Sequence, residues 1–127
     1  MQTVSERSIV AAVGSLVHVK VIGKPDEGAY ISLTAQVAEH IQRHGEVHLL
    51  LEADAIASRF DDCSSLAFWQ YAVRDFRYRP SIKRVALIGD PRWALALAVL
   101  CKPYTSAKIC HFGRDDVMEA KRWADEP

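Results

Sequence analysis

Two short apolar runs restrict the fold of this chain more than any other feature. Residues 46–53 contain one Val and three Leu in nearly continuous order, and residues 82–88 form a second run of the same kind. Such runs are typical of strands that are covered on both faces, whereas a strand with one wet face alternates apolar and polar residues. The sequence therefore predicts a sheet with other elements packed against it.

The beginning of the chain predicts a β-hairpin. Residues 9–13 are apolar, and residues 16–22 alternate valines with polar side chains. Gly14-Ser15 between them is a permitted two-residue hairpin loop. A further short strand is expected at residues 108–112, which gives five strands in all.

Apolar residues recur at helical spacing in four other segments. Their ends carry recognisable signals, such as Asp26 and Gly45 at the first segment and Asp90-Pro91 before the third. We expect helices at about 26–44, 62–79, 92–102 and 115–124. The order β-β-α-β-α-β-α-β-α predicts an α/β fold with a mixed, largely parallel sheet and right-handed crossovers. We expect one domain over residues 1–127.

Composition narrows the classes of partner. Lys and Arg together number 16, as do Asp and Glu, so the formal net charge is zero. Nucleic acids and anionic membranes select clearly basic surfaces, and we expect neither as a partner. The longest apolar run, 93–101, is too short to span a bilayer. The three cysteines form no CxxC pair, which favours reduced thiols and a cytoplasmic location.

Three passages carry a family resemblance that spans nearly the whole chain. They are LLLEA at 49–53, VALIGDPRW at 85–93 and KPYTSAKICHF at 102–112. Together with the element order, they resemble the SpoIIAA-like branch of the STAS family, whose members include anti-sigma-factor antagonists. The resemblance implies a non-enzymatic regulatory or binding module that acts through protein–protein contacts, with an unidentified protein partner and self-association as a homodimer. It implies no cofactor.

The first candidate site is the start of the second predicted helix. The antagonists carry an Asp-Ser-Ser-Gly-Leu-Gly motif there, whose first serine is phosphorylated, and this chain has Asp62, Cys63, Ser64 and Ser65 at the matching positions. Because Cys63 replaces that serine, we expect no phosphorylation switch. The amides and dipole of a helix start can hold an anion or activate a thiolate. The alternative is an ordinary helix cap with a small buried thiol.

The second candidate site is the third predicted helix, which is apolar on nearly all sides. Trp93 belongs to the core face, while Leu95 and Val99 project elsewhere. Neighbouring elements cover this second face, or it meets a partner chain or an apolar ligand. We therefore consider Trp93, Leu95 and Val99 as an interface or an apolar-ligand site.

Two further functions stay open as alternatives. SpoIIAA-like folds are similar in architecture to CRAL-TRIO lipid-exchange domains, which suggests a carrier or sensor of a small lipid-like ligand. An enzyme that uses Cys63 ranks behind it, because no second catalytic group can be tied to that thiol. His40 and His44 have the spacing of a metal-binding pair on one helix face. A solvated helix end explains them equally well, and we expect no metal site.

Overall fold

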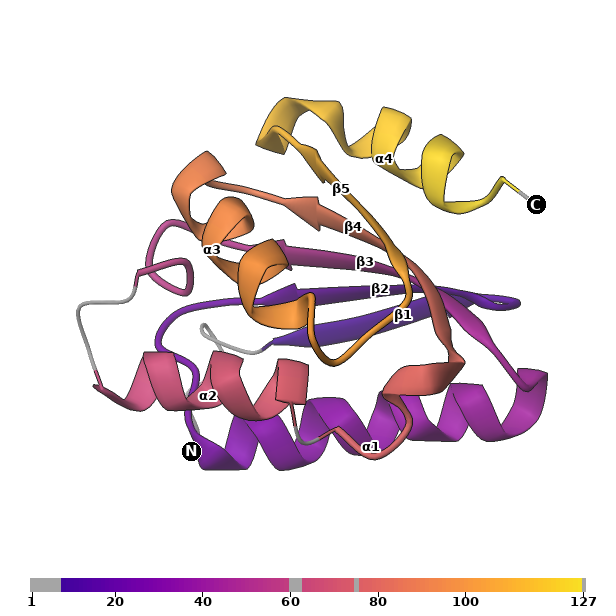
Figure 1. The fold of residues 1–127 in the computed structure, drawn as a ribbon, viewed down its shortest axis with the longest axis horizontal. Helices are drawn as coiled ribbons and strands as arrows, with labels where there is room; N and C mark the ends of the chain where they lie inside the picture. Colours follow the sequence, from indigo (N-terminus) through magenta and orange to yellow (C-terminus); the bar gives the residue numbers. More distant parts are fainter. Residues whose placement is uncertain (1–7, 60–62, 75, 127) are drawn as a thin grey trace, which may run out of the picture.

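The computed structural model describes residues 8–59, 63–74 and 76–126. Five strands form one sheet in the order of the chain: β1 (Ile9–Val13), β2 (Leu16–Val21), β3 (Val47–Ala53), β4 (Ile82–Ile88) and β5 (Lys108–Phe112). β1 pairs antiparallel with β2, and every other neighbouring pair is parallel (Figure 1). The predicted mixed, largely parallel sheet is therefore confirmed.

Three helices connect the parallel strands and lie on one face of the sheet. They are α1 (Glu27–His44), α2 (Cys63–Arg74) and α3 (Pro91–Cys101). The last helix, α4 (Val117–Ala124), lies on the opposite face and is drawn in yellow in Figure 1. Both faces of the central strands are thus covered, as their near-continuous apolar sequences require.

Local signals account for the ends of α1 and α3. The side chain of Asp26 accepts a hydrogen bond of 2.8 Å from a backbone amide in the first turn of α1, and Gly45 ends that helix at a φ of 82°. A positive φ is easily reached by glycine alone, since it has no Cβ. At α3, Asp90 caps the first turn and Pro91 is the first helical residue.

The period of two along each strand divides the core into two clusters. Val17, Val19 and Val21 on β2 face α1, α2 and α3 and belong to the larger cluster. Leu50 on β3 faces the other way and packs with the buried Ala120 and Ala124 of α4. The cluster between the sheet and the three helices is therefore the main core.

Two element boundaries differ from the sequence prediction. The second helix was expected to reach Arg79, but α2 ends at Arg74, and the segment Arg79–Ser81 forms a separate 3₁₀ turn. Pro80 lies in the first part of this turn, where its missing amide hydrogen costs nothing. A second 3₁₀ turn, Arg114–Asp116, precedes α4. Within the described ranges, no helix has the length and hydropathy needed to cross a membrane.

Candidate functional site

A cavity of about 110 Å³ lies between the sheet and the three helices of the main face. Its floor consists of alternate residues of β2 to β5, among them Val19, Leu51, Val85 and Ile109. Because side chains alternate along a strand, a single face of a parallel sheet presents such a continuous aliphatic surface.

The floor is incompletely covered at its centre. Leu51 and Val85 are only half-buried although β3 and β4 are the inner strands of the sheet, and Ile109 beside them on β5 is also half-buried. A fully packed core would remove such side chains from water. The helices therefore leave an opening above the floor through which a small molecule can reach it.

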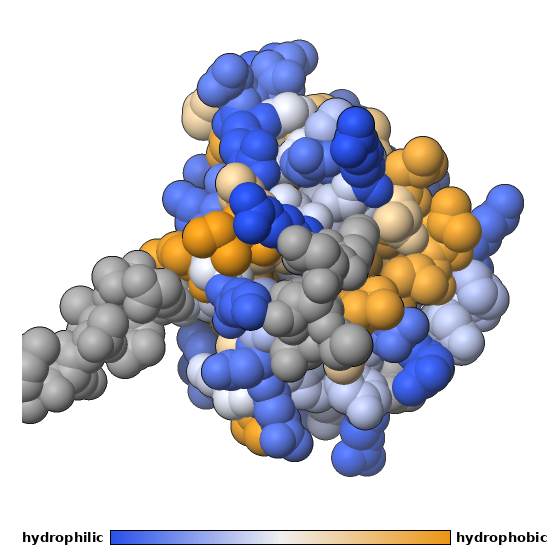
Figure 2. All heavy atoms as spheres, turned by 90° about the vertical axis from the view of Figure 1, so that its left-hand side faces the viewer, coloured by the Kyte–Doolittle hydropathy of each residue, from blue (hydrophilic) through white to orange (hydrophobic). Residues whose placement is uncertain are grey.

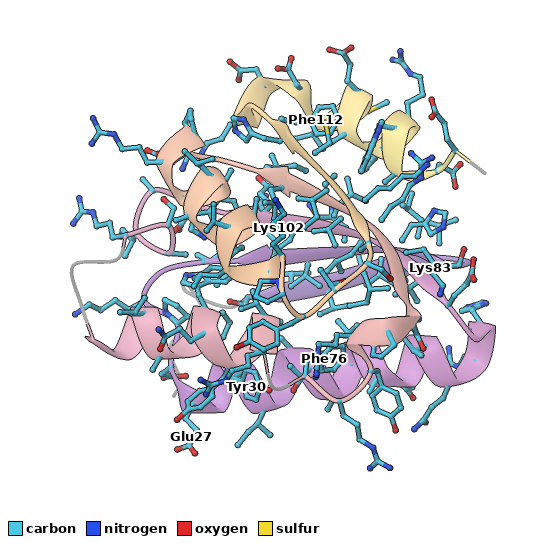
Figure 3. The ribbon with its side chains drawn as sticks, in the orientation of Figure 1. Glu27, Tyr30, Phe76, Lys83, Lys102 and Phe112 are labelled. Atoms are coloured by element: carbon cyan, nitrogen blue, oxygen red, sulfur yellow. The ribbon has the colours of Figure 1, made fainter. Side chains whose placement is uncertain are left out.

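Aromatic side chains form much of the wall. Tyr30 of α1 meets Phe68 of α2 edge to face at a ring separation of 6.2 Å, and Phe68 meets Trp69 at 4.9 Å. The indole N–H of Trp69 donates a hydrogen bond of 2.9 Å to the backbone oxygen of Ala57, which holds this ring in place. Figure 3 shows Tyr30 on α1 and Phe76 on the segment after α2, and both residues line the cavity.

Few polar groups line the cavity. Arg79 is the sole residue with a charged side chain among those that line it in the described part of the chain. The hydroxyl group of Thr34 already has a partner, because it donates a hydrogen bond of 2.6 Å to the backbone oxygen of Tyr30. Burial raises the pKa of the Cys101 thiol to about 11, so this thiol is neutral at physiological pH. Among the described residues, the lining of the cavity is thus mostly apolar, with one positively charged side chain, that of Arg79.

The structure leaves the first predicted site untested. Asp62 lies outside the described residues, and Cys63, Ser64 and Ser65 form the first residues of α2. The prediction that they cap a helix or bind an anion therefore stays a prediction.

The structure separates the residues of the second predicted site. Trp93 is fully buried and packs against Trp69 at a ring separation of 5.3 Å, on the core side of α3. Leu95 and Val99 are 69% and 63% exposed on its outer side. Figure 2 shows apolar side chains gathered on the side of the molecule where α3 lies. The outer face of α3 is thus left open by the described part of this chain.

Three of the five histidines have separate partners. His18 contacts Glu52 at 2.9 Å, His111 contacts the backbone oxygen of Gly89 at 2.9 Å, and His48 contacts α4. The described residues contain no group of three potential metal ligands. Isolated structural roles account for these three side chains.

Sequence reasoning missed the cavity and the role of Arg79 at its wall. Arg79 precedes a proline, and the sequence prediction placed it at the end of the second helix. Trp69 and Phe76 fall in the second predicted helical segment and line the cavity, but no periodicity distinguishes a core position from one that borders a void. Arg74, Arg77 and Arg79 all occur beside these aromatic residues, and nothing in the sequence distinguishes Arg79 from the other two.

Comparison with known proteins identifies a family. The family model described as SpoIIAA-like matches residues 16–125 of the 127. This range begins with β2 and ends just after α4, so it includes every element that lines the cavity. No match was found among curated proteins or among solved structures.

Proposed function

Because the chain belongs to the SpoIIAA-like family of STAS-type domains, which are typically regulatory protein-interaction modules, we propose that it is a non-enzymatic sensor or carrier of a small apolar ligand. The observation that carries this proposal is the cavity of about 110 Å³ between the sheet and α1, α2 and α3. Binding sites for small molecules are typically concave and apolar, with few polar groups.

The half-buried floor supplies a favourable free energy for the binding of an apolar ligand. Leu51 and Val85 on the inner strands and Ile109 on β5 retain contact with water, and an apolar ligand would remove that contact. Burial of apolar surface contributes roughly 25 cal/mol per Å². The ligand would also restore the dispersion contacts that side chains around a void lack.

The chemistry of the lining favours binding over catalysis. Cys101 is the cysteine on the cavity wall, and its raised pKa keeps it as a neutral thiol. A nucleophilic thiol needs a lowered pKa or an adjacent base. Neither accompanies Cys101 among the described residues of the lining.

A fluorescent lipid-like probe tests the proposal. We expect saturable binding to the parent protein, and weaker binding, by about tenfold, to Val85→Phe, since a larger ring would occupy the space above the floor. Val13→Phe makes the same change at an exposed residue of β1 that does not line the cavity, and it serves as the matched control. The proposal is wrong if no apolar probe binds, or if both variants bind it as the parent does while all three proteins remain folded.

A second candidate function is a protein contact through the outer face of α3. The exposure of Leu95 and Val99 favours it, because exposed apolar side chains that lie one turn apart on a helix form a ready contact surface. Leu97 and Cys101 of the same helix line the cavity. Ligand binding inside and partner binding outside would therefore act on one helix, as expected of a regulatory module.

A further inference from the structure

Arg79 lies at the cavity wall, where its guanidinium forms hydrogen bonds to backbone oxygens. Its Nη1 donates a hydrogen bond of 3.0 Å to the backbone oxygen of Phe76, and its Nε donates one of 3.2 Å to that of Tyr104. Both acceptors are neutral carbonyls. Among the residues that the structure describes, no carboxylate lies within ion-pair distance of Arg79.

The two carbonyl contacts hold the guanidinium but leave most of its donors available. A guanidinium has five N–H donors in a planar fork, and these contacts use two of them. The free donors include both on Nη2. A planar fork of this kind matches the two oxygens of a carboxylate.

A second donor lies on the same side of the cavity. Arg79 is bonded to the backbone of Tyr104, and the next residue, Thr105, also lines the cavity. The hydroxyl oxygen of Thr105 accepts a hydrogen bond of 3.1 Å from the amide of Ala107, which leaves the hydroxyl hydrogen free to donate. Arg79 and Thr105 therefore form a polar end on an otherwise apolar cavity.

From this arrangement we infer that the ligand is a single-chain amphiphile with a terminal carboxylate, whose chain fills the cavity and whose carboxylate binds Arg79 and Thr105. The inference rests on the ligand-binding function proposed above and names the class of ligand. Arg79 is half-buried, and a carboxylate would give its guanidinium the charged partner that the described residues do not supply, whereas a neutral ligand would not. A phosphomonoester carries up to two negative charges, and the wall offers one positive charge to balance them.

The size of the void sets the length of the chain. A cavity of about 150 Å³ accepts a benzene ring. The cavity here is about 110 Å³ and opens above its floor, so it holds a short alkyl segment and no large ring system, while the rest of a longer chain extends through the opening. Octanoate, with octan-1-ol as a partner of the same chain length and no charge, is therefore a suitable pair of probes.

Calorimetric titration of the parent protein with the two probes is the first test. We expect octanoate to bind at least about tenfold more tightly than octan-1-ol, since a hydrogen-bonded charge pair contributes at least that much. Arg79→Gln should abolish this preference while it leaves the affinity for octan-1-ol unchanged. Arg79→Lys keeps the charge and should retain part of the preference.

Arg77→Gln provides the matched control. Arg77 is an exposed neighbour whose guanidinium lies 5.7 Å from the ring of Tyr78, and it does not line the cavity. Its variant should bind both probes as the parent does. Equal affinity of the parent for the two probes would overturn the carboxylate inference and leave the apolar cavity as a ligand site. Failure of both probes to bind would overturn the proposed function as well.

Discussion

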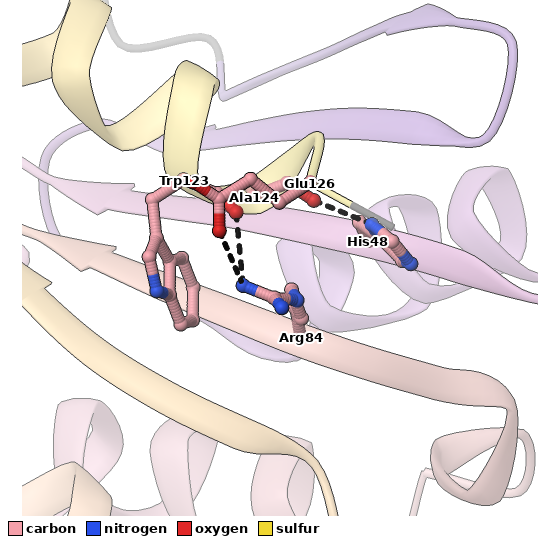
Figure 4. Close-up of polar contacts among 5 residues, drawn as sticks. All are labelled: His48, Arg84, Trp123, Ala124 and Glu126. Atoms are coloured by element: carbon pink, nitrogen blue, oxygen red, sulfur yellow. Dashed lines mark hydrogen bonds and ion pairs between the residues drawn. The ribbon is translucent and has the colours of Figure 1, made fainter.

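Arg84 and Trp123 contact each other in two ways. The Nη1 of Arg84 donates a hydrogen bond of 3.0 Å to the backbone oxygen of Trp123, and its guanidinium lies 4.9 Å from the centre of the indole ring (Figure 4). His48 on the neighbouring strand bonds to the backbone oxygen of Ala124. The last turn of a helix has carbonyl groups without intrahelical partners. Arg84 on β4 and His48 on β3 form hydrogen bonds with two carbonyl oxygens at the end of α4.

Arg84→Ala should therefore destabilise the domain. Arg84 is largely buried, with 12% of its side chain exposed, and the change removes a charge-assisted hydrogen bond and a cation–π contact. We expect the free energy of unfolding to fall by about 1–3 kcal/mol in urea denaturation. Arg122→Ala changes an exposed arginine of the same helix and should stay within about 0.5 kcal/mol of the parent. Similar losses for both variants would mean that the contact with Trp123 contributes nothing specific.

The two sides of α3 should respond differently to truncation. Leu97 is fully buried and borders the cavity, so Leu97→Ala should lower the free energy of unfolding by about 2–5 kcal/mol. Leu95→Ala makes the same chemical change at a side chain that is 69% exposed and should cost less than about 0.5 kcal/mol. Denaturant titrations of the two variants compare the sides directly. A large loss for Leu95→Ala in dilute protein would place that residue in a core.

The exposed side of α3 should mediate self-association. We expect the parent protein to form dimers in a concentration-dependent way, and the double variant Leu95→Lys with Val99→Lys to stay folded and monomeric. Two charged side chains would have to lose their hydration in the interface, which opposes association. Sedimentation velocity over a range of concentrations measures both proteins. A parent protein that stays monomeric at the highest concentration, or a double variant that unfolds, would contradict this prediction.

Alkylation should distinguish the thiols by their environment. Burial raises the pKa of Cys101 from 9.0 to about 11, so about 0.1% of it is thiolate at pH 8. Its reaction with iodoacetamide should be slow and should accelerate about tenfold per pH unit until the pH approaches 11. Cys63 at the start of α2 should react faster, because the positive end of a helix favours the thiolate. Peptide mapping after alkylation at graded pH measures both rates. Equal rates at pH 8 would contradict the prediction.

The raised pKa of Cys101 also makes the free energy of unfolding depend on pH at high pH. Since the folded state raises the pKa of Cys101, the unfolded chain releases this proton first as the pH rises. The contribution of this thiol to stability is therefore fully present below about pH 9 and is lost as the pH rises through about 11. Cys101→Ser should make the unfolding free energy less sensitive to pH in this window.

The sequence by itself determined the elements and their order. The Asp26 cap, the Gly45 stop and the Asp90-Pro91 start act on residues within one turn, so they are readable without knowledge of the rest of the chain. The apolar runs at β3 and β4 likewise predicted covered strands. These signals are local, and the structure confirms the helices and strands that they predicted.

Only the tertiary structure decided the cavity and its charged end. The cavity depends on how α1, α2 and α3 pack against the sheet. Its lining combines residues that are far apart in the sequence, such as Val19, Trp69 and Ile109. The placement of Arg79 depends on Tyr104, which lies in the segment after α3. The helical pattern of α3 showed an excess of apolar residues but could not say which side stays exposed, because burial is decided by neighbours that the helix meets only after folding.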